Sequence, residues 1–140
     1  MSINYCSEDV SVLKIKKRKI SGWIKETIIS EGKIPGEISF IFCSDNFLLE
    51  VNKQYLNHDY FTDIITFDYV ENDVISGDIF ISCDRVKENA KEFNAEFLNE
   101  LSRIIIHGVL HLCGYKDKSK KDKFLMTQKE DFYLNVLANC

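Results

Sequence analysis

No stretch of this 140-residue sequence approaches the ~20 consecutive apolar residues that a membrane-spanning helix needs. Its first residues show neither the basic start nor the apolar stretch of a secretory signal peptide. The five cysteines are odd in number, are scattered and include no C-x-x-C pair, so no disulfide framework is implied. These absences favour a protein of the reducing cytoplasm that makes no membrane contact.

An overall positive charge is also absent, because the formal net charge is −4. Cations gather in two places instead. Residues 14–19 hold five positive charges in six positions, which we interpret as a solvated first helical turn rather than an RNA contact. Residues 116–123 hold five lysines and are expected to form a loop, and either a solvated surface or an RNA contact remains open for them.

Length and composition predict one globular domain, residues 1–140, with no internal repeat. Short alternating or apolar runs predict strands near 3–6, 37–42, 62–67 (a buried strand) and 77–82, with 71–73 as a hairpin turn. Helical patterns are found near 20–32, 45–55, 84–94, 97–113 and 124–137. Helices and strands interleaved over one small mixed sheet indicate an α+β or a three-layer α/β domain.

Caps and buried faces follow from the same patterns. Ser44 or Asp45 is expected to cap the second helix and Asp84 the third. The predicted inner faces are Ile20, Trp23, Ile24 and Ile28 in the first helix, Leu48, Val51 and Tyr55 in the second, and Phe124, Leu125, Phe132, Leu134 and Leu137 in the last.

Residues 104–113 contain two of the three histidines as their only strongly polar side chains. With the apolar residues just before it, this segment predicts a largely buried helix of four to five turns. His107 and His111 are four residues apart and therefore share one helical face. Gly114 tolerates left-handed backbone and is expected to end the helix, and Asp117 follows on the returning chain. Two ligands from a helix and a third from beyond a glycine predict a three-ligand metal site with one open position.

The spacing matches the metzincin pattern H-E-x-x-H-x-x-G-x-x-H at both histidines, the glycine and the third-ligand position. Gly108 stands where a metalloprotease has its general base, which argues against proteolysis. Asp117 can still bind zinc, because carboxylate oxygens are zinc ligands. The alternative is that both histidines bond to backbone carbonyls in the core and Asp117 caps the next turn. Four positions in register favour the metal.

A glycine within a helix costs roughly 0.5–1 kcal/mol relative to alanine. Two explanations for Gly108 stay open. Its bare backbone could let a substrate or strand approach the metal, or it could allow close packing of the helix on the sheet.

The YbeY family signature H-G-x-L-H-L-x-G-Y closely resembles the run His107-Gly-Val-Leu-His111-Leu-Cys-Gly114-Tyr115. Members of this family are bacterial metal-dependent endoribonucleases that act in ribosomal RNA maturation. The family's N-x-x-Y-R…T-D-V-L-S-F block is similar to Asn52-x-x-Tyr55 followed by Thr62-Asp63-Ile-Ile-Thr-Phe67. Its G-D-I-x-I strand is similar to Gly77-Asp78-Ile-Phe-Ile81. The resemblance extends from about residue 38 to the C-terminus.

The resemblance implies a four-stranded mixed sheet with about five helices, one zinc ion per chain, and RNA as substrate. It implies single-strand-specific cleavage in ribosomal RNA maturation, notably at the 3′ end of the small-subunit RNA, and a part in ribosome quality control. The implied partners are ribosomal RNA, the small ribosomal subunit and its assembly factors, but neither DNA nor membranes. By family position, Asp63 and Asp78 are candidates to accept the proton in catalysis; as an alternative, they are strand-end or turn residues bonded to nearby backbone.

Two positions depart from the family pattern. The third ligand, usually a histidine, is Asp117, and the arginine after N-x-x-Y is Leu56. An arginine there would suit a phosphate or developing negative charge. His58, Lys53 and Lys116 are the candidates to replace that cation, although His58 also fits an ordinary surface loop.

Two other functions stay open. The first is a metal-dependent hydrolase of another substrate, such as a peptidase, against which Gly108 argues. The second is a non-catalytic ribosome-assembly factor with a structural metal, which Leu56 keeps open. Structural zinc sites more often have four protein ligands, and no cysteine is placed as an obvious fourth.

Overall fold

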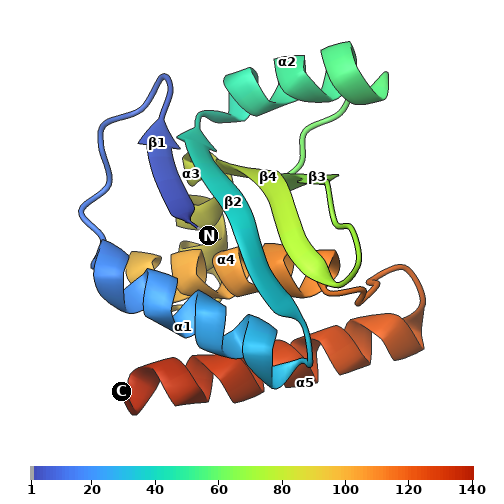
Figure 1. Ribbon diagram of the computed structural model, residues 1–140. Helices are drawn as coiled ribbons and strands as arrows, with labels where there is room; N and C mark the ends of the chain where they lie inside the picture. Colours follow the sequence, from blue (N-terminus) through green and yellow to red (C-terminus); the bar gives the residue numbers. More distant parts are fainter. Residues whose placement is uncertain (1) are drawn as a thin grey trace.

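One four-stranded sheet lies at the centre of the structure, a computed structural model that describes residues 2–140 (Figure 1). Its strands are β1 (Ile3–Ser7), β2 (Ile34–Cys43), β3 (Ile64–Asp68) and β4 (Val74–Ser82), in the spatial order β1-β2-β4-β3. β1, β2 and β4 are parallel, whereas β3 runs antiparallel along the edge. The predicted mixed sheet is thus confirmed. The prediction of a buried strand at 62–67 was wrong, because β3 is an edge strand in which only Ile65 is buried.

Five helices cover the sheet unequally. They are α1 (Lys17–Ser30), α2 (Asp45–Leu56), α3 (Cys83–Glu92), α4 (Phe97–Leu112) and α5 (Lys120–Ala138). The main core lies between one face of the sheet and α1 and α4, with α5 packed on α4; a smaller cluster on the opposite face lies beneath α2 (Figure 1). These layers confirm the α+β class. They leave α4 sandwiched between the sheet and α5.

The inner face of α1 is confirmed, since Ile20, Trp23, Ile24 and Ile28 are all buried. The predicted inner face of the last helix is correct only for Leu134 and Leu137, which are partly buried against the main core. The buried residues of α5 are Met126, Glu130 and Tyr133, whereas Phe124 and Phe132 are exposed. In α2, Tyr55 is likewise exposed rather than buried. Both errors have one cause: these helices have apolar residues on more than one face, so periodicity alone does not choose the packed one.

The cap of α2 is Ser44, whose Oγ accepts a hydrogen bond from Phe47 N at 3.1 Å. This confirms Ser44 over Asp45, the other predicted candidate. The cap of α3 is Ser82 and not Asp84, because β4 runs directly into the helix in extended backbone. Asp84 instead accepts from the backbone N of Asp45 at 2.9 Å. The Asp84 carboxylate therefore satisfies one backbone N–H group at the start of α2, just after the carboxyl end of β2.

The hairpin turn and the lysine-rich segment match their predictions to different degrees. The predicted hairpin turn is confirmed, with Asn72 and Asp73 in left-handed backbone at φ 50° and 65°. The lysine-rich segment is only in part a loop, because Ser119 caps α5 and the helix begins at Lys120. The lysines at 120, 121 and 123 are consequently on its first turn.

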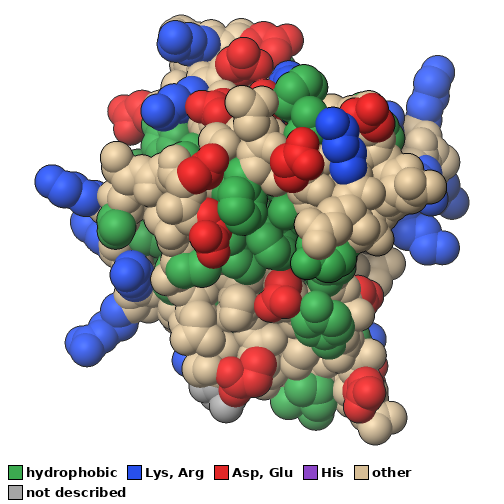
Figure 2. Space-filling view, turned by 90° about the horizontal axis from the view of Figure 1, so that it is seen from above, with side chains coloured by type: hydrophobic (Ala, Val, Ile, Leu, Met, Phe, Trp, Pro, Cys, Tyr) green, Lys and Arg blue, Asp and Glu red, His purple; other side chains and the backbone are tan. Residues whose placement is uncertain are grey.

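No helix within residues 2–140 is both long and apolar enough to cross a membrane. Figure 2 shows the molecule from above, from the end at which α2 lies in Figure 1. Acidic side chains border an apolar strip on this face, and lysine and arginine side chains stand mostly at its outline. This face is therefore poorly suited to a polyanion.

Candidate metal centre and its cavity

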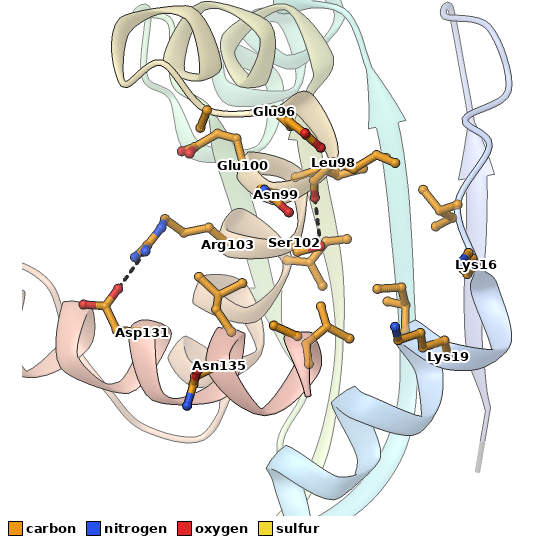
Figure 3. Close-up of a pocket in the computed structure, with 18 of the residues that line it drawn as sticks. Lys16, Lys19, Glu96, Leu98, Asn99, Glu100, Ser102, Arg103, Asp131 and Asn135 are labelled. Atoms are coloured by element: carbon orange, nitrogen blue, oxygen red, sulfur yellow. Dashed lines mark hydrogen bonds and ion pairs between the residues drawn. The ribbon is translucent and has the colours of Figure 1, made fainter. Parts of the chain in front are cut away.

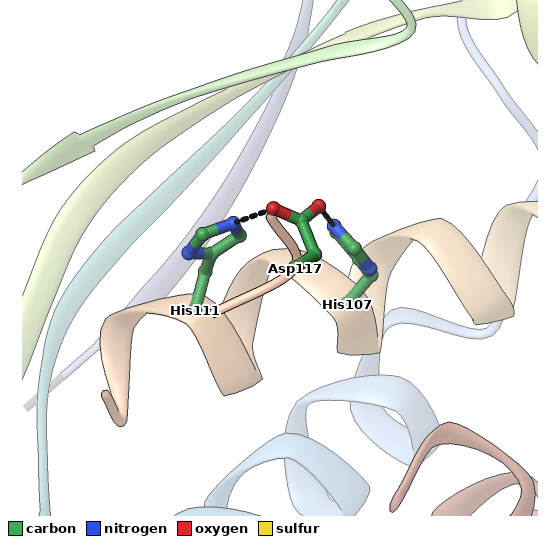
Figure 4. Close-up of side chains that lie close together, drawn as sticks. All are labelled: His107, His111 and Asp117. Atoms are coloured by element: carbon green, nitrogen blue, oxygen red, sulfur yellow. Dashed lines mark ion pairs between the residues drawn. The ribbon is translucent and has the colours of Figure 1, made fainter. Parts of the chain in front are cut away.

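His107 and His111 project from the last two turns of α4 toward Asp117, which lies on the chain that returns after the helix (Figure 4). The Nε2 atom of His107 is 3.2 Å from Asp117 Oδ2, and that of His111 is 3.4 Å from Oδ1. One ligand atom from each residue lies within 4.8 Å of the other two. Gly114 has a φ of +112°, which provides the reversal that places Asp117 here. The structure thus brings together the three residues predicted as ligands.

The donor set fits a small divalent cation. Two ligand atoms about 2.0–2.1 Å from a tetrahedral zinc ion would be about 3.3 Å apart, close to both contacts just given. Two imidazoles and one carboxylate also form a common zinc ligand set. Asp117 is not the cap of α5, and both histidines face its carboxylate rather than a backbone carbonyl. The cluster therefore matches a metal site better than it matches a pair of core histidines.

Glu130, on α5, is a further functional residue that the sequence patterns did not reveal. Its Oε2 lies 2.6 Å from His107 Nδ1, and its Oε1 accepts a hydrogen bond from Arg103 at 2.8 Å. Arg103 also pairs with Asp131 at 2.6 Å. A carboxylate on Nδ1 favours the tautomer whose Nε2 lone pair faces Asp117 and the cavity. The available signal was an acid at the centre of the buried stripe of α5, where a charge needs a partner.

The pKa of His107 reflects these neighbours. Burial lowers it, but the hydrogen bond and charge of Glu130 and the charge of Asp117 outweigh burial and leave the pKa above its ordinary value. A proton on His107 and a cation at the cluster compete for the same Nε2 lone pair. Metal binding at this site is therefore expected to weaken as the pH falls.

A solvent-connected cavity of about 660 Å³ opens over the cluster. Besides the three clustered residues, its lining comprises Asn52, Leu56, His58, Tyr60, Thr62, Asp63, Ile64, Ile65, Thr66, Asp68, Leu112 and Lys118. Asp63 is thus in the cavity, and its backbone carbonyl accepts a hydrogen bond from Ser82 N at 2.9 Å, which fixes the start of β3.

Asp78, the other predicted catalytic acid, lies apart from the cluster. Side chains alternate along β4, so Gly77 and Ile79 face α4 while Asp78 points to the opposite side of the sheet. There it accepts a hydrogen bond from the hydroxyl of Tyr69 at 3.2 Å. Asp78 is not among the residues that line the cavity over the cluster.

Leu56 lines the cavity where the family pattern has arginine. Of the three candidate replacements, Lys53 pairs instead with Glu50 and Asp59 at 3.7 and 3.5 Å. Lys116 is not among the lining residues, whereas His58 is. Lys118 is a further basic side chain in the lining. His58 and Lys118 are therefore the basic side chains that line the cavity among the residues the structure describes.

The two explanations for Gly108 are distinguished by its surroundings. A Cβ there would lie 3.0 Å from Ile64 Cδ1 and 3.2 Å from both Cδ1 and Cγ2 of Ile79. The bare face of the residue is therefore turned to the sheet. Close packing of α4 accounts for the glycine, and substrate access does not.

A second cavity, of about 770 Å³, lies between the beginnings of α1 and α4 and the end of α5 (Figure 3). Lys16 and Lys19 stand on one side of it, and Glu96 and Glu100 on the other. It shares no lining residue with the cavity over the cluster.

Fold and cluster together define a class of protein: a small α+β domain whose mixed sheet supports a histidine–histidine–aspartate group of metal-binding type. The family model described as endoribonuclease YbeY matches residues 4–138 of this chain. The chain belongs to the endoribonuclease YbeY family, and the family resemblance of its motifs is confirmed.

Similar proteins agree with this assignment. The chain is 53% identical over 137 residues to endoribonuclease YbeY of Parabacteroides distasonis, covering 98% of this chain and 96% of that protein. It is 60% identical over 114 residues to the protein of the same name from Flavobacterium psychrophilum, covering 81% of each. The solution structure of TM1509 from Thermotoga maritima is similar with a TM-score of 0.68 and 30% identity, over 97% of this chain and 89% of that one.

Proposed function

We propose that this chain is a zinc-dependent endoribonuclease that cuts single-stranded RNA in the cytoplasm. Its place would be ribosomal RNA maturation, including the 3′ end of the small-subunit RNA, and ribosome quality control, in contact with the small subunit and its assembly factors. Family membership supports the reaction class. The observation that carries the metal dependence is the convergence of His107, His111 and Asp117 at the floor of an open cavity.

Each group has a role in this proposal. His107, His111 and Asp117 hold the ion, which when bound supplies Lewis-acid activation of the phosphodiester and of water. Lys118 orients the phosphate, in place of the arginine absent at position 56. Asp63, half-buried in the same cavity, accepts the proton of the attacking water.

Three protein ligands favour a catalytic over a structural metal, because structural zinc sites are usually closed by a fourth. Leu56 is the observation that favours the second candidate, a non-catalytic assembly factor. The two candidates share the metal and differ only in cleavage, so one experiment separates them.

The experiment measures zinc content and cleavage of an unstructured RNA on the same preparations, without an affinity tag. His111→Ala and Asp117→Ala should each weaken metal binding by about tenfold or more, which is about 1.4 kcal/mol. Both should lose cleavage, and added zinc should restore cleavage in part to Asp117→Ala. Asp122→Ala, an acid beyond the cluster on the first turn of α5, should retain metal and activity.

Wild-type protein that binds zinc but leaves RNA intact would identify the assembly factor instead. Equal zinc affinity in wild type and Asp117→Ala would exclude Asp117 as a ligand.

A further inference from the structure

The loop between α2 and β3 carries a pair of stacked aromatic rings on the wall of the cavity over the cluster. The rings of His58 and Tyr60 have centroids 5.1 Å apart and an interplanar angle of 21°. The hydroxyl oxygen of Tyr60 lies 3.0 Å from His58 Nδ1. Even so, 56% of Tyr60 is exposed. Because each ring covers only one face of the other, the pair leaves aromatic surface accessible.

The backbone beneath these rings is anchored. Asn52, which is buried in α2, donates from its side-chain Nδ2 to the backbone carbonyl of Tyr60 at 2.9 Å. The backbone carbonyl of Asn52 accepts a hydrogen bond from His58 N at 3.1 Å. Asn57 turns the chain in left-handed backbone at φ 55°. Arg85 lies over the neighbouring ring of Phe61, 5.4 Å from its centroid. An aromatic surface that is already ordered loses little conformational entropy when a ligand stacks on it.

The charges of the cavity make such a surface useful. Asp63, Asp68 and Asp117 line it together with Lys118, so the lining is not cationic enough to hold a polyanion by charge alone. Stacking on a base does not depend on the sign of nearby charges. It also requires an unpaired base, because bases within a duplex are already stacked on each other.

We propose that His58 and Tyr60 form a nucleobase subsite, which stacks an unpaired base of the RNA next to the phosphate at the cluster. This inference rests on the proposed endoribonuclease function and adds to it the group that selects single strands. Tyr60 and His58 act on binding, and the three clustered residues act on the bond that is cut.

The test combines protein and RNA changes in a double-mutant cycle. A short unpaired RNA and versions with a single abasic position, moved along the strand, are mixed rapidly with the metal-loaded protein. Binding is read by fluorescence anisotropy before cleavage proceeds. Tyr60→Ala should raise the dissociation constant about tenfold. One abasic position should raise it similarly for the wild type and add nothing further for Tyr60→Ala, while Tyr60→Trp should retain wild-type behaviour.

Tyr69→Ala is the matched control, since Tyr69 is 57% exposed and hydrogen-bonds to Asp78 on the opposite face of the sheet. It should leave RNA binding unchanged, and zinc content should be equal in all variants. If abasic positions penalise the wild type and Tyr60→Ala equally while RNA is still cut, the subsite is refuted and the proposed function stands. If the wild type neither binds nor cuts RNA, both are refuted.

Discussion

Both carboxylate oxygens of Glu130 are engaged, one by His107 and the other by Arg103, and the residue is only 7% exposed. A buried carboxylate held in this way has two effects on the imidazole. It fixes the ring orientation and makes Nε2 a better donor to a cation. The metal affinity of the cluster should therefore depend on a residue that is not itself a ligand.

Glu130→Gln should weaken zinc binding by about 10–100-fold, because the amide keeps the shape but loses the negative charge that supports His107. A competition titration against a chromophoric chelator measures the change. Asp131→Asn is the control: Asp131 also pairs with Arg103, but it is mostly exposed and does not contact His107. Equal affinities in the two variants would mean that Glu130 serves only the packing of α5.

At the scale of one element, α4 both carries two of the clustered residues and packs closely on the sheet. One side carries the histidines, and the other packs against β3 and β4 through Gly108. A small residue at the packed face brings the helix close to the sheet. This packing sets the distance between the histidines and Asp63, which lies immediately before β3.

The same substitution in two helices should have opposite effects on stability. In Gly108→Ala the helix-propensity gain of about 1 kcal/mol is outweighed by crowding of about 1–3 kcal/mol against Ile64 and Ile79, so we expect net destabilisation. In Gly22→Ala, in α1, the new Cβ meets nothing within 4 Å, and stabilisation of up to about 1 kcal/mol should result. Urea unfolding of both variants gives the two free energies. A stabilised Gly108→Ala would show that the sheet contact is loose.

At the scale of the molecule, Glu31 at the end of α1 connects three distant segments. It accepts hydrogen bonds from the hydroxyls of Tyr115, after α4, and Tyr133, in α5, and pairs with Lys129. Tyr115 is two residues from Asp117, so this connection also steadies the returning chain. Burial raises the pKa of the Glu31 carboxyl, but these hydrogen bonds and the charge of Lys129 outweigh burial and leave the pKa below its ordinary value.

A carboxyl with a lowered pKa in the folded state adds stability above its unfolded pKa of 4.5, and this stability is lost as the pH falls through the folded value. Glu31→Gln should therefore be less stable than wild type at pH 7, by about 1–3 kcal/mol, with the gap shrinking below pH 4.5. Urea unfolding of the metal-free proteins at pH 7 and at lower pH measures it. Glu26→Gln, at an exposed position on α1, should leave the pH dependence of the unfolding free energy as in wild type. If the stability difference between wild type and Glu31→Gln stays the same below pH 4.5, the packing of the side chain and not its charge is responsible.

Local patterns sufficed for much of the fold and for the cluster itself. Hydrophobic periodicity located the helices and strands, and the four-residue spacing of His107 and His111 with the reversal at Gly114 located three ligand candidates. These features depend on residues close in sequence, whose relative positions are set by helix geometry and backbone conformation.

Only the tertiary structure decided which faces are buried and which distant groups meet. Asp63 and Asp78 look alike in sequence, but the alternation of β4 and its place in the sheet send Asp78 to the far side. Glu130 reaches His107 from 23 residues away because α5 packs on α4. Such contacts depend on how whole elements pack, and the free energy of packing is shared among many residues, so no short segment of the sequence specifies them.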